Sequence, residues 1–186
     1  MSGLAVPANL TFYAGQPPTP QLNAMSQAFS FLLARVAFRA RRAGAGTVAR
    51  NAHTLIPWDS VDEDPYGGWA AGNPAAYTVQ QSGWYICCGT VSLAGTGAAG
   101  TVLIPSLSIN GSSPTGQGTV GWEGPEIFPP TGASDPKCVT ALWEAYCIAG
   151  DQIALDCYVS NEPSANPTWQ TTAGVQSRIE LLWMSV

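Results

Sequence analysis

The stretch LWEAYCIAGDQIAL, residues 142–155, decides the fold that this chain is expected to adopt. Two runs of strand-forming residues, 137–148 and 152–160, are separated here by Gly150-Asp151, a pair typical of tight turns. A second hairpin is indicated by Asn110-Gly111, the strongest short turn signal in the chain. Further runs rich in Val, Ile, Tyr and Trp lie near residues 54–58, 76–80, 84–93, 101–110 and 177–185. Seven short strands separated by turn residues predict an all-β, antiparallel jelly-roll sandwich.

The N-terminal fifty residues carry a different pattern. Residues 1–18 are rich in proline and glycine and are expected to form an extended arm. Thr19 and Pro20 are a suitable cap and first position for one short helix, which the arginines at 39–42 and the glycines at 44–46 would end. Its apolar stripe is spaced by three and four residues and comprises Leu22, Met25, Phe29, Leu32 and Val36. We therefore predict an arm and helix over residues 1–50 and a jelly-roll head over residues 51–186.

Charged residues are sorted along the chain. Residues 1–58 contain five of the seven basic residues and no acidic one, which gives a net charge of +5. Residues 59–186 contain all twelve acidic residues and two basic ones, which gives −10. This division indicates a basic attachment segment joined to an acidic head. Charged residues make up only 10% of the chain, against roughly 25% in a typical soluble domain, so part of the surface is expected to be buried in an assembly.

Few residues point to catalysis or to metal binding. His53 is the only histidine, no GxSxG motif is present, and the GxGxxG match at residues 95–100 precedes a strand-like run rather than a helix. The acidic cluster at residues 59–64 lacks the spacing of a calcium loop and is interpreted as solvated. A hydrolase would rest on carboxylates that the sequence does not bring together. We expect no catalytic residue, no metal ligand and no cofactor.

The five cysteines are interpreted as reduced and mostly buried, acting as small apolar side chains. A disulfide among Cys138, Cys147 and Cys157 is the alternative. No apolar run approaches the roughly 20 residues that a membrane span requires, and the N-terminus does not resemble a signal peptide. The arginines at 35–42 are interpreted as a basic helix end rather than a nucleic-acid site. We expect neither a membrane span nor a nucleic-acid partner.

The predicted head resembles the jelly roll of the tumour necrosis factor and complement globular-head superfamily. GWYIC at residues 83–87 resembles that family's G-x-Y-x-F strand, and Asn110-Gly111 resembles its hairpin. The stretch at 142–155 resembles its late strand, turn and strand, and SRIELL at 177–182 resembles its closing strand. The resemblance covers residues 54–186 and implies a homotrimer. The collagen stalk of animal members is absent, so no immune function is implied.

The N-terminal part resembles the start of minor tail and other small virion proteins of actinobacterial tailed phages. The matching segments are FYAG at 12–15, TPQLNA at 19–24 and AFRA at 37–40. The resemblance implies a phage structural protein found in the virion, assembled in the cytoplasm of the bacterial host and attached through its N-terminal segment to other virion proteins. Both a tail-tip and a capsid-decoration role fit. The expected anchor residues are Leu22, Met25, Phe29, Leu32, Arg39, Arg41 and Arg42.

Aromatic residues supply two further sets of candidates. The candidates for contacts between subunits of a trimer are Tyr85, Trp143, Tyr146 and Trp183. These four aromatic residues could equally belong to the core of one subunit. The alternative function is a head that binds carbohydrate on the host surface, because loop tryptophans can stack on sugar rings. Its candidates are Trp69, Trp122 and Trp169, which are expected to be exposed in loops rich in glycine and proline. The alternative is that these tryptophans plug the domain or pack at a subunit contact.

Overall fold

The computed structural model describes residues 23, 25, 37–94, 102–111, 122–123, 137–160 and 167–185. The predicted arm over residues 1–18 and the stripe residues Leu22, Phe29 and Leu32 lie outside this part of the chain. Asn23 and Met25 are helical, and Met25 is half-buried. None of the helical residues that the structure describes belongs to a helix long and apolar enough to cross a bilayer.

The described residues form strands that pair antiparallel throughout. In chain order the strands are β1 Ala37–Arg42, β2 His53–Leu55, β3 Ser60–Glu63, β4 Trp69–Ala70, β5 Asn73–Thr78, β6 Gly83–Ala94, β7 Val102–Ile109, β8 Trp122–Glu123, β9 Lys137–Cys147, β10 Gln152–Ser160, β11 Thr168–Trp169 and β12 Ser177–Ser185. The predicted strands at 76–80, 84–93, 101–110, 137–148, 152–160 and 177–185 are confirmed within one to three residues at their ends.

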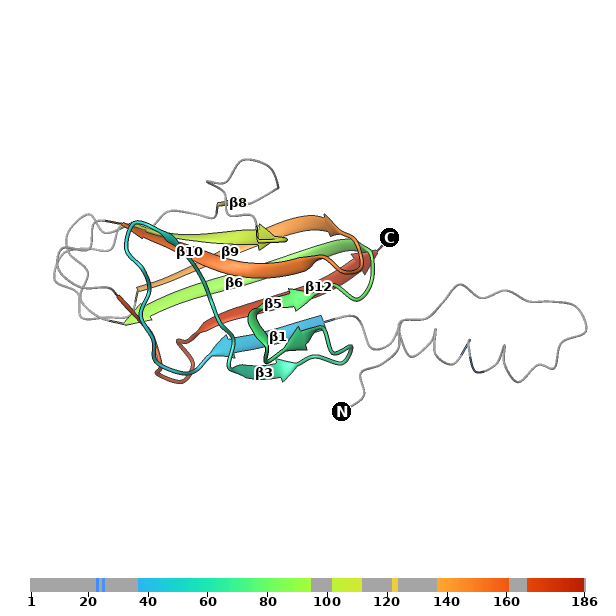
Figure 1. Cartoon of the computed structure of the whole chain (residues 1–186), viewed down its shortest axis with the longest axis horizontal. Coiled ribbons are helices and arrows are strands. Elements are labelled where there is room, and N and C mark those ends of the chain that lie inside the picture. The colour runs from blue at the N-terminus through green and yellow to red at the C-terminus, as the bar shows by residue number, and fades with distance from the viewer. Residues whose placement is uncertain are drawn as a thin grey trace, which may run out of the picture.

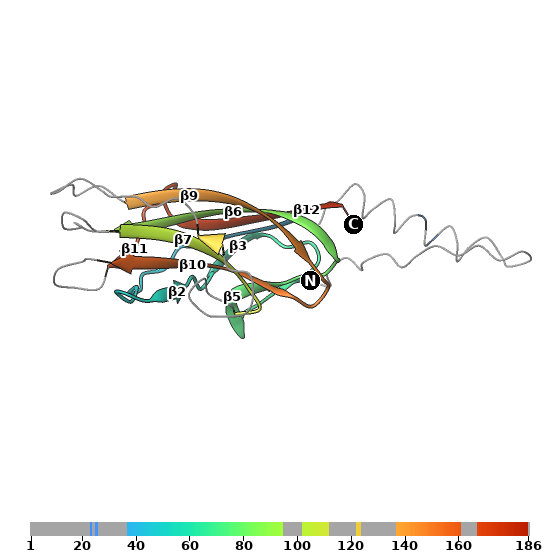
Figure 2. The ribbon, with the colours of Figure 1, turned by 90° about the horizontal axis from the view of Figure 1, so that it is seen from above.

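Two sheets face each other and enclose the core (Figure 1). The β6 sheet has the order β9-β6-β12-β1-β3, with β11 beside β12 on one edge of β6. The β10 sheet has the order β4-β5-β10-β7-β8, with β2 next to β5 on one edge of β10. Figure 2 shows β9, β6 and β12 side by side in one layer and β10, β2 and β5 in the other. The predicted all-β, antiparallel jelly-roll sandwich is confirmed.

Turn chemistry explains the two predicted hairpins. Asn110 and Gly111 both have positive φ, 56° and 75°, as the hairpin turn that follows β7 requires. Gly150, with φ of 100°, occupies the turn between β9 and β10. The Asp151 carboxylate accepts hydrogen bonds from the Ile148 N–H and from the Asn110 side-chain amide, so it links the two turns. The signals at Asn110-Gly111 and Gly150-Asp151 therefore mark real turns at one end of the sandwich.

The prediction that Arg39, Arg41 and Arg42 close a helix is wrong. Ala37–Arg42 is strand β1, which lies between β12 and β3 in the β6 sheet. Phe38 and Ala40 point into the core while Arg39 is exposed, so the segment follows a period of two residues. The sequence pattern extends the helix too far because this segment becomes a strand by pairing with β3 and with β12, which lies some 140 residues later in the chain. The sandwich thus includes residues that precede position 51.

The predicted strand at 54–58 is shorter in the structure. β2 ends at Leu55, and the next residues turn two large side chains, Ile56 and Trp58, into the core. Their backbone N–H groups donate to the carbonyls of Leu155 and Pro74 instead of forming a regular ladder. The segment therefore closes one side of the core as an irregular connection.

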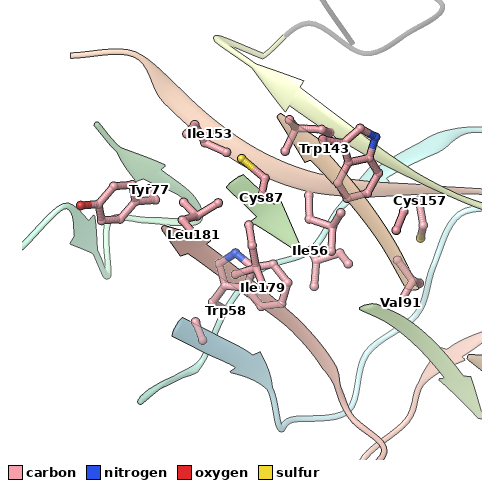
Figure 3. Packing of buried hydrophobic residues seen from close by; sticks show 14 of the residues in the cluster. Ile56, Trp58, Tyr77, Cys87, Val91, Trp143, Ile153, Cys157, Ile179 and Leu181 are labelled. Atoms are coloured by element: carbon pink, nitrogen blue, oxygen red, sulfur yellow. The ribbon is translucent and has the colours of Figure 1, made fainter. Parts of the chain in front are cut away.

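The core between the sheets is apolar and dominated by large side chains. Figure 3 shows Ile56, Trp58, Cys87, Ile179 and Leu181 gathered there, each 2% exposed or less. All five cysteines are free, so the alternative of a disulfide among Cys138, Cys147 and Cys157 is wrong. Burial raises the pKa of the Cys87 and Cys157 thiols well above the usual range and that of Cys147 to about 11. These three thiols are therefore core groups held in the neutral form.

Candidate functional site

The side of the β6 sheet that is turned away from the core carries large exposed apolar side chains, among them Trp84, Leu142 and Tyr146. Side chains alternate along each strand, so every second residue of β9, β6, β12 and β1 points outward. We call this surface the outer face. Its outward residues are Thr140, Leu142, Glu144 and Tyr146 from β9, Trp84, Ile86, Cys88 and Thr90 from β6, Arg178, Glu180, Leu182 and Met184 from β12, and Ala37, Arg39 and Arg41 from β1.

One end of the outer face is apolar apart from Glu144. Trp84 lies opposite Tyr146, and their rings meet edge to face with centroids 5.6 Å apart. Leu142, in the middle of the edge strand β9, is 69% exposed, a high value for a leucine within a strand. The half-buried Ile86 and Leu182 lie opposite each other on β6 and β12. Adjoining exposed apolar side chains of this kind are typical of surfaces that contact another molecule.

The other end of the outer face is charged. Arg39 and Glu180 are cross-strand partners 3.5 Å apart, and Arg41 holds Asp62 through two nitrogens at 2.8–3.1 Å. Arg178 lies directly opposite Arg41 and shares with it a hollow of about 200 Å³. Between the two ends lies a second hollow of about 190 Å³, lined by Cys88 and by the Arg39–Glu180 pair. The outer face therefore combines an apolar half with a half built from ion pairs.

The expected anchor arginines are bound to acidic residues of their own sandwich. Besides the pairs of Arg39 and Arg41, Arg42 lies 2.6 Å from Asp59, whose carboxylate also accepts the N–H groups of Ala43 and Gly44. Arg41 and Arg42 of β1 are thus paired with Asp62 and Asp59, which lie in the segment that follows β2. The proposed contact of these arginines with an acidic virion surface would have to compete with these internal pairs.

Three of the four residues of the acidic cluster, Asp59, Asp62 and Asp64, have structural partners. The Asp64 carboxylate accepts hydrogen bonds from the N–H groups of Gly68 and Trp69 and closes the loop before β4.

His53, the only histidine of the sequence, has a structural partner as well. Its Nδ1 lies 3.0 Å from the carboxylate of Asp156, a residue that is 1% exposed, and the two side chains join β2 to β10. Within the described ranges, no group of three or more His, Cys, Asp and Glu side chains is arranged to hold a metal ion.

The aromatic candidates for subunit contacts differ in which side of their strand they lie on. Tyr85 is fully buried and Trp143 is 8% exposed, and both point between the sheets, so their assignment as subunit contacts is corrected. Trp183 is partly buried against the core and donates its indole N–H to the Ser82 carbonyl. Tyr146, by contrast, is 52% exposed on the outer face. Neighbouring residues in a strand face opposite sides, so Trp84 and Tyr146, rather than Tyr85 and Ala145, are available to a partner.

The tryptophans proposed to stack on sugars occupy other positions than expected. Trp169 lies in β11, is 3% exposed and packs in the core. Trp69 packs against the core and donates its indole N–H to the Pro74 carbonyl. Trp122 lies in β8, and its side chain is outside the described part of the chain. The expectation that Trp69 and Trp169 stand free in loops is therefore wrong.

Sequence reasoning missed most of the outer face. Trp84, Ile86, Leu142, Leu182 and Met184 were not singled out, although each lies in a predicted strand. Their signal is an apolar residue at the position where a half-solvated strand should carry a polar one. This signal is hidden in strands that carry apolar residues on both sides, because the sequence does not say which side faces the core.

Comparisons with known proteins identify the fold. The globular domain of zebrafish complement 1qA is similar over 81% of this chain and 97% of its own, with a TM-score of 0.58 and 12% sequence identity. The tumour necrosis factor Eiger from S. frugiperda is similar over 81% of this chain and 93% of its own, with a TM-score of 0.55 and 12% identity. No protein-family model matches the sequence, and no curated protein matches it. The chain therefore has the jelly-roll architecture of these two domains.

Proposed function

We propose that the protein is a non-enzymatic structural protein of a tailed-phage virion, a homotrimeric knob attached through its acid-free N-terminal segment. The outer face carries the trimeric part of this proposal. An exposed Leu142 and an exposed Trp84–Tyr146 pair on a regular sheet are costly in water and are stabilised when a second copy covers them. The fold shared with the complement and tumour necrosis factor domains is compatible with a closed ring of three copies.

Replacing Leu142 by aspartate is expected to break the trimer. At a covered contact the substitution removes about 1.5–3 kcal/mol of apolar burial from each copy and adds a carboxylate that loses its water. We expect wild-type protein at micromolar concentration to sediment at three times its chain mass of 19.4 kDa and the variant to sediment as a monomer. Analytical ultracentrifugation of the full chain, supported by native mass spectrometry, measures both.

The matched control is Leu55→Asp. Leu55 is also exposed, at 45%, but lies on β2 in the opposite sheet. This variant should remain trimeric. A wild-type protein that is a stable monomer, or an equal loss of assembly in both variants, would contradict the trimer.

The virion role is supported by the low content of charged residues and by the N-terminal resemblance to phage virion proteins. Phe29→Asp combined with Leu32→Asp interrupts the apolar stripe of the predicted helix. We expect particles assembled with this variant to lose most of their copies, measured by quantitative mass spectrometry of purified virions. Because neither residue belongs to a strand that the structure describes, we expect the purified variant still to form the trimer.

Copy number and position within the particle distinguish the two virion roles. A tail-tip protein is present in few copies and affects adsorption to the host. A decoration protein is present in many copies at the symmetry axes of the capsid and affects particle stability. Particle imaging with a labelled chain locates it, and absence of the protein from purified virions would overturn the virion role altogether.

A further inference from the structure

Glu144 is a carboxylate placed within the apolar half of the outer face. It lies opposite Ile86 on β6, and its neighbours of the same parity on β9 are Leu142 and Tyr146. Among the described residues, no hydrogen-bond donor or basic group binds its side chain. In a single copy the carboxylate is exposed and hydrated. A partner that covered Leu142 and Tyr146 would remove that water.

Arg178 is the corresponding cation in the charged half. Its cross-strand neighbours are Thr90 on β6 and Arg41 on β1, and neither can neutralise it. Arg41 is already held by Asp62, and a like charge directly opposite destabilises a sheet. Within the described part of the chain, Arg178 is the basic residue without a partner. The others each have one, namely Arg39, Arg41, Arg42, Arg50 and Lys137.

These two charges cannot meet within one copy. Glu144 on β9 lies opposite Ile86 of β6, and Arg178 on β12 lies opposite Thr90 of β6. Because β9 and β12 flank β6 on its two sides, Glu144 and Arg178 are two strand spacings apart across the sheet and four residues apart along it. With strands about 4.8 Å apart and a rise of about 3.4 Å per residue, their Cα atoms lie roughly 17 Å apart. That distance exceeds the reach of the two side chains together.

We infer that Glu144 of one copy forms an ion pair with Arg178 of the next copy in the assembly. The inference rests on the proposed trimer and assigns the contact that fixes how its copies are oriented. Covering the apolar half leaves Glu144 without water, and a buried unpaired charge is strongly destabilising, so a cation must accompany it. In a ring, two different patches of each copy meet at every contact. Arg178, on the same face and without a partner among the described residues, is the cation that this contact requires.

Charge reversal tests the pair directly. Glu144→Arg and Arg178→Glu should each shift the concentration at which half of the chains are assembled upward by about tenfold or more, because each places like charges in contact. The double variant, Glu144→Arg with Arg178→Glu, restores opposite charges and should return that concentration to within about threefold of wild type. Sedimentation equilibrium of the full-length proteins measures all four midpoints, and circular dichroism confirms that each variant is folded.

Glu63 provides the matched control. It is the second carboxylate in the described residues without a partner, but it lies at the far edge of the sheet on β3, in register with Arg39. Glu63→Arg combined with Arg178→Glu should assemble no better than Arg178→Glu alone. If the shift in assembly concentration of the Glu144 and Arg178 double variant equalled the two single shifts added together, the ion pair would be overturned. That outcome would leave the trimer itself intact. A monomeric wild type would overturn both.

Discussion

Replacing Trp58 by alanine is expected to lower the free energy of unfolding by about 3–5 kcal/mol. Trp58 is 1% exposed and lies between the sheets beside Ile179 (Figure 3). Its segment is irregular, and its own N–H donates to the Pro74 carbonyl at 2.9 Å. The surroundings belong to two different sheets and cannot collapse into the space that the indole leaves, so a cavity remains. Urea unfolding followed by circular dichroism, at one fixed protein concentration, measures the loss.

Trp58→Phe separates packing from hydrogen bonding at this position. The indole nitrogen of Trp58 is buried and has no hydrogen-bond partner among the described residues. Phenylalanine therefore removes volume without removing a hydrogen bond, and we expect a smaller loss of about 1–2 kcal/mol. If Trp58→Ala unfolded at the same urea concentration as wild type, the irregular segment would not be part of the core.

Replacing Gly68 by alanine is the second large effect, with an expected loss of about 2–3 kcal/mol or more. A Cβ at this position would overlap the Tyr77 ring and the Thr78 carbonyl oxygen. Neither neighbour can move freely. Tyr77 is fully buried and stacks on Phe38 with ring centroids 4.8 Å apart, and the Thr78 N–H donates to the Gly68 carbonyl at 2.8 Å. The Asp64 carboxylate also fixes the Gly68 N–H.

Gly72→Ala is the control for this change. It lies four residues further along the same region, and a Cβ there would have no neighbour within 4 Å. We expect its stability to stay within about 0.5 kcal/mol of wild type. Thermal and urea unfolding of the two alanine variants compare them under the same conditions. Equal effects at the two glycines would show that the loop, and not the overlap with Tyr77, determines the cost.

The interface candidates show how far sequence patterns reach. Of the aromatic residues proposed for subunit contacts, Tyr146 alone stands well exposed on the outer face, whereas Tyr85 and Trp143 are in the core. The sequence GWYIC places Trp84 and Tyr85 next to each other, so a strand must send one outward and one inward. Both are large aromatics, and hydrophobicity does not distinguish them. The choice depends on which face of β6 meets the other sheet.

The arginines of β1 show the same limit for charge. A run of basic residues after an apolar stripe of helical spacing is typical of a helix end, and the sequence favoured that interpretation. The structure pairs Arg39 with Glu180, Arg41 with Asp62 and Arg42 with Asp59. Two of these acids belong to the loop and strand near residue 60, and the third lies 141 positions away. The division of charge along the chain is therefore partly cancelled inside the folded sandwich.

The sequence by itself determined what depends on neighbours along the chain. Turn residues such as Asn110-Gly111 and Gly150 set the positions of hairpins through their own φ angles, and runs of strand-forming residues located most of the strands. Only the tertiary structure decided that residues 37–42 join the sheet, which side of each strand faces the core, and that Glu144 and Arg178 lie on one exposed face. These outcomes depend on pairing between segments far apart in the chain. A period of two residues fixes the alternation of a strand but not which of its two faces is buried.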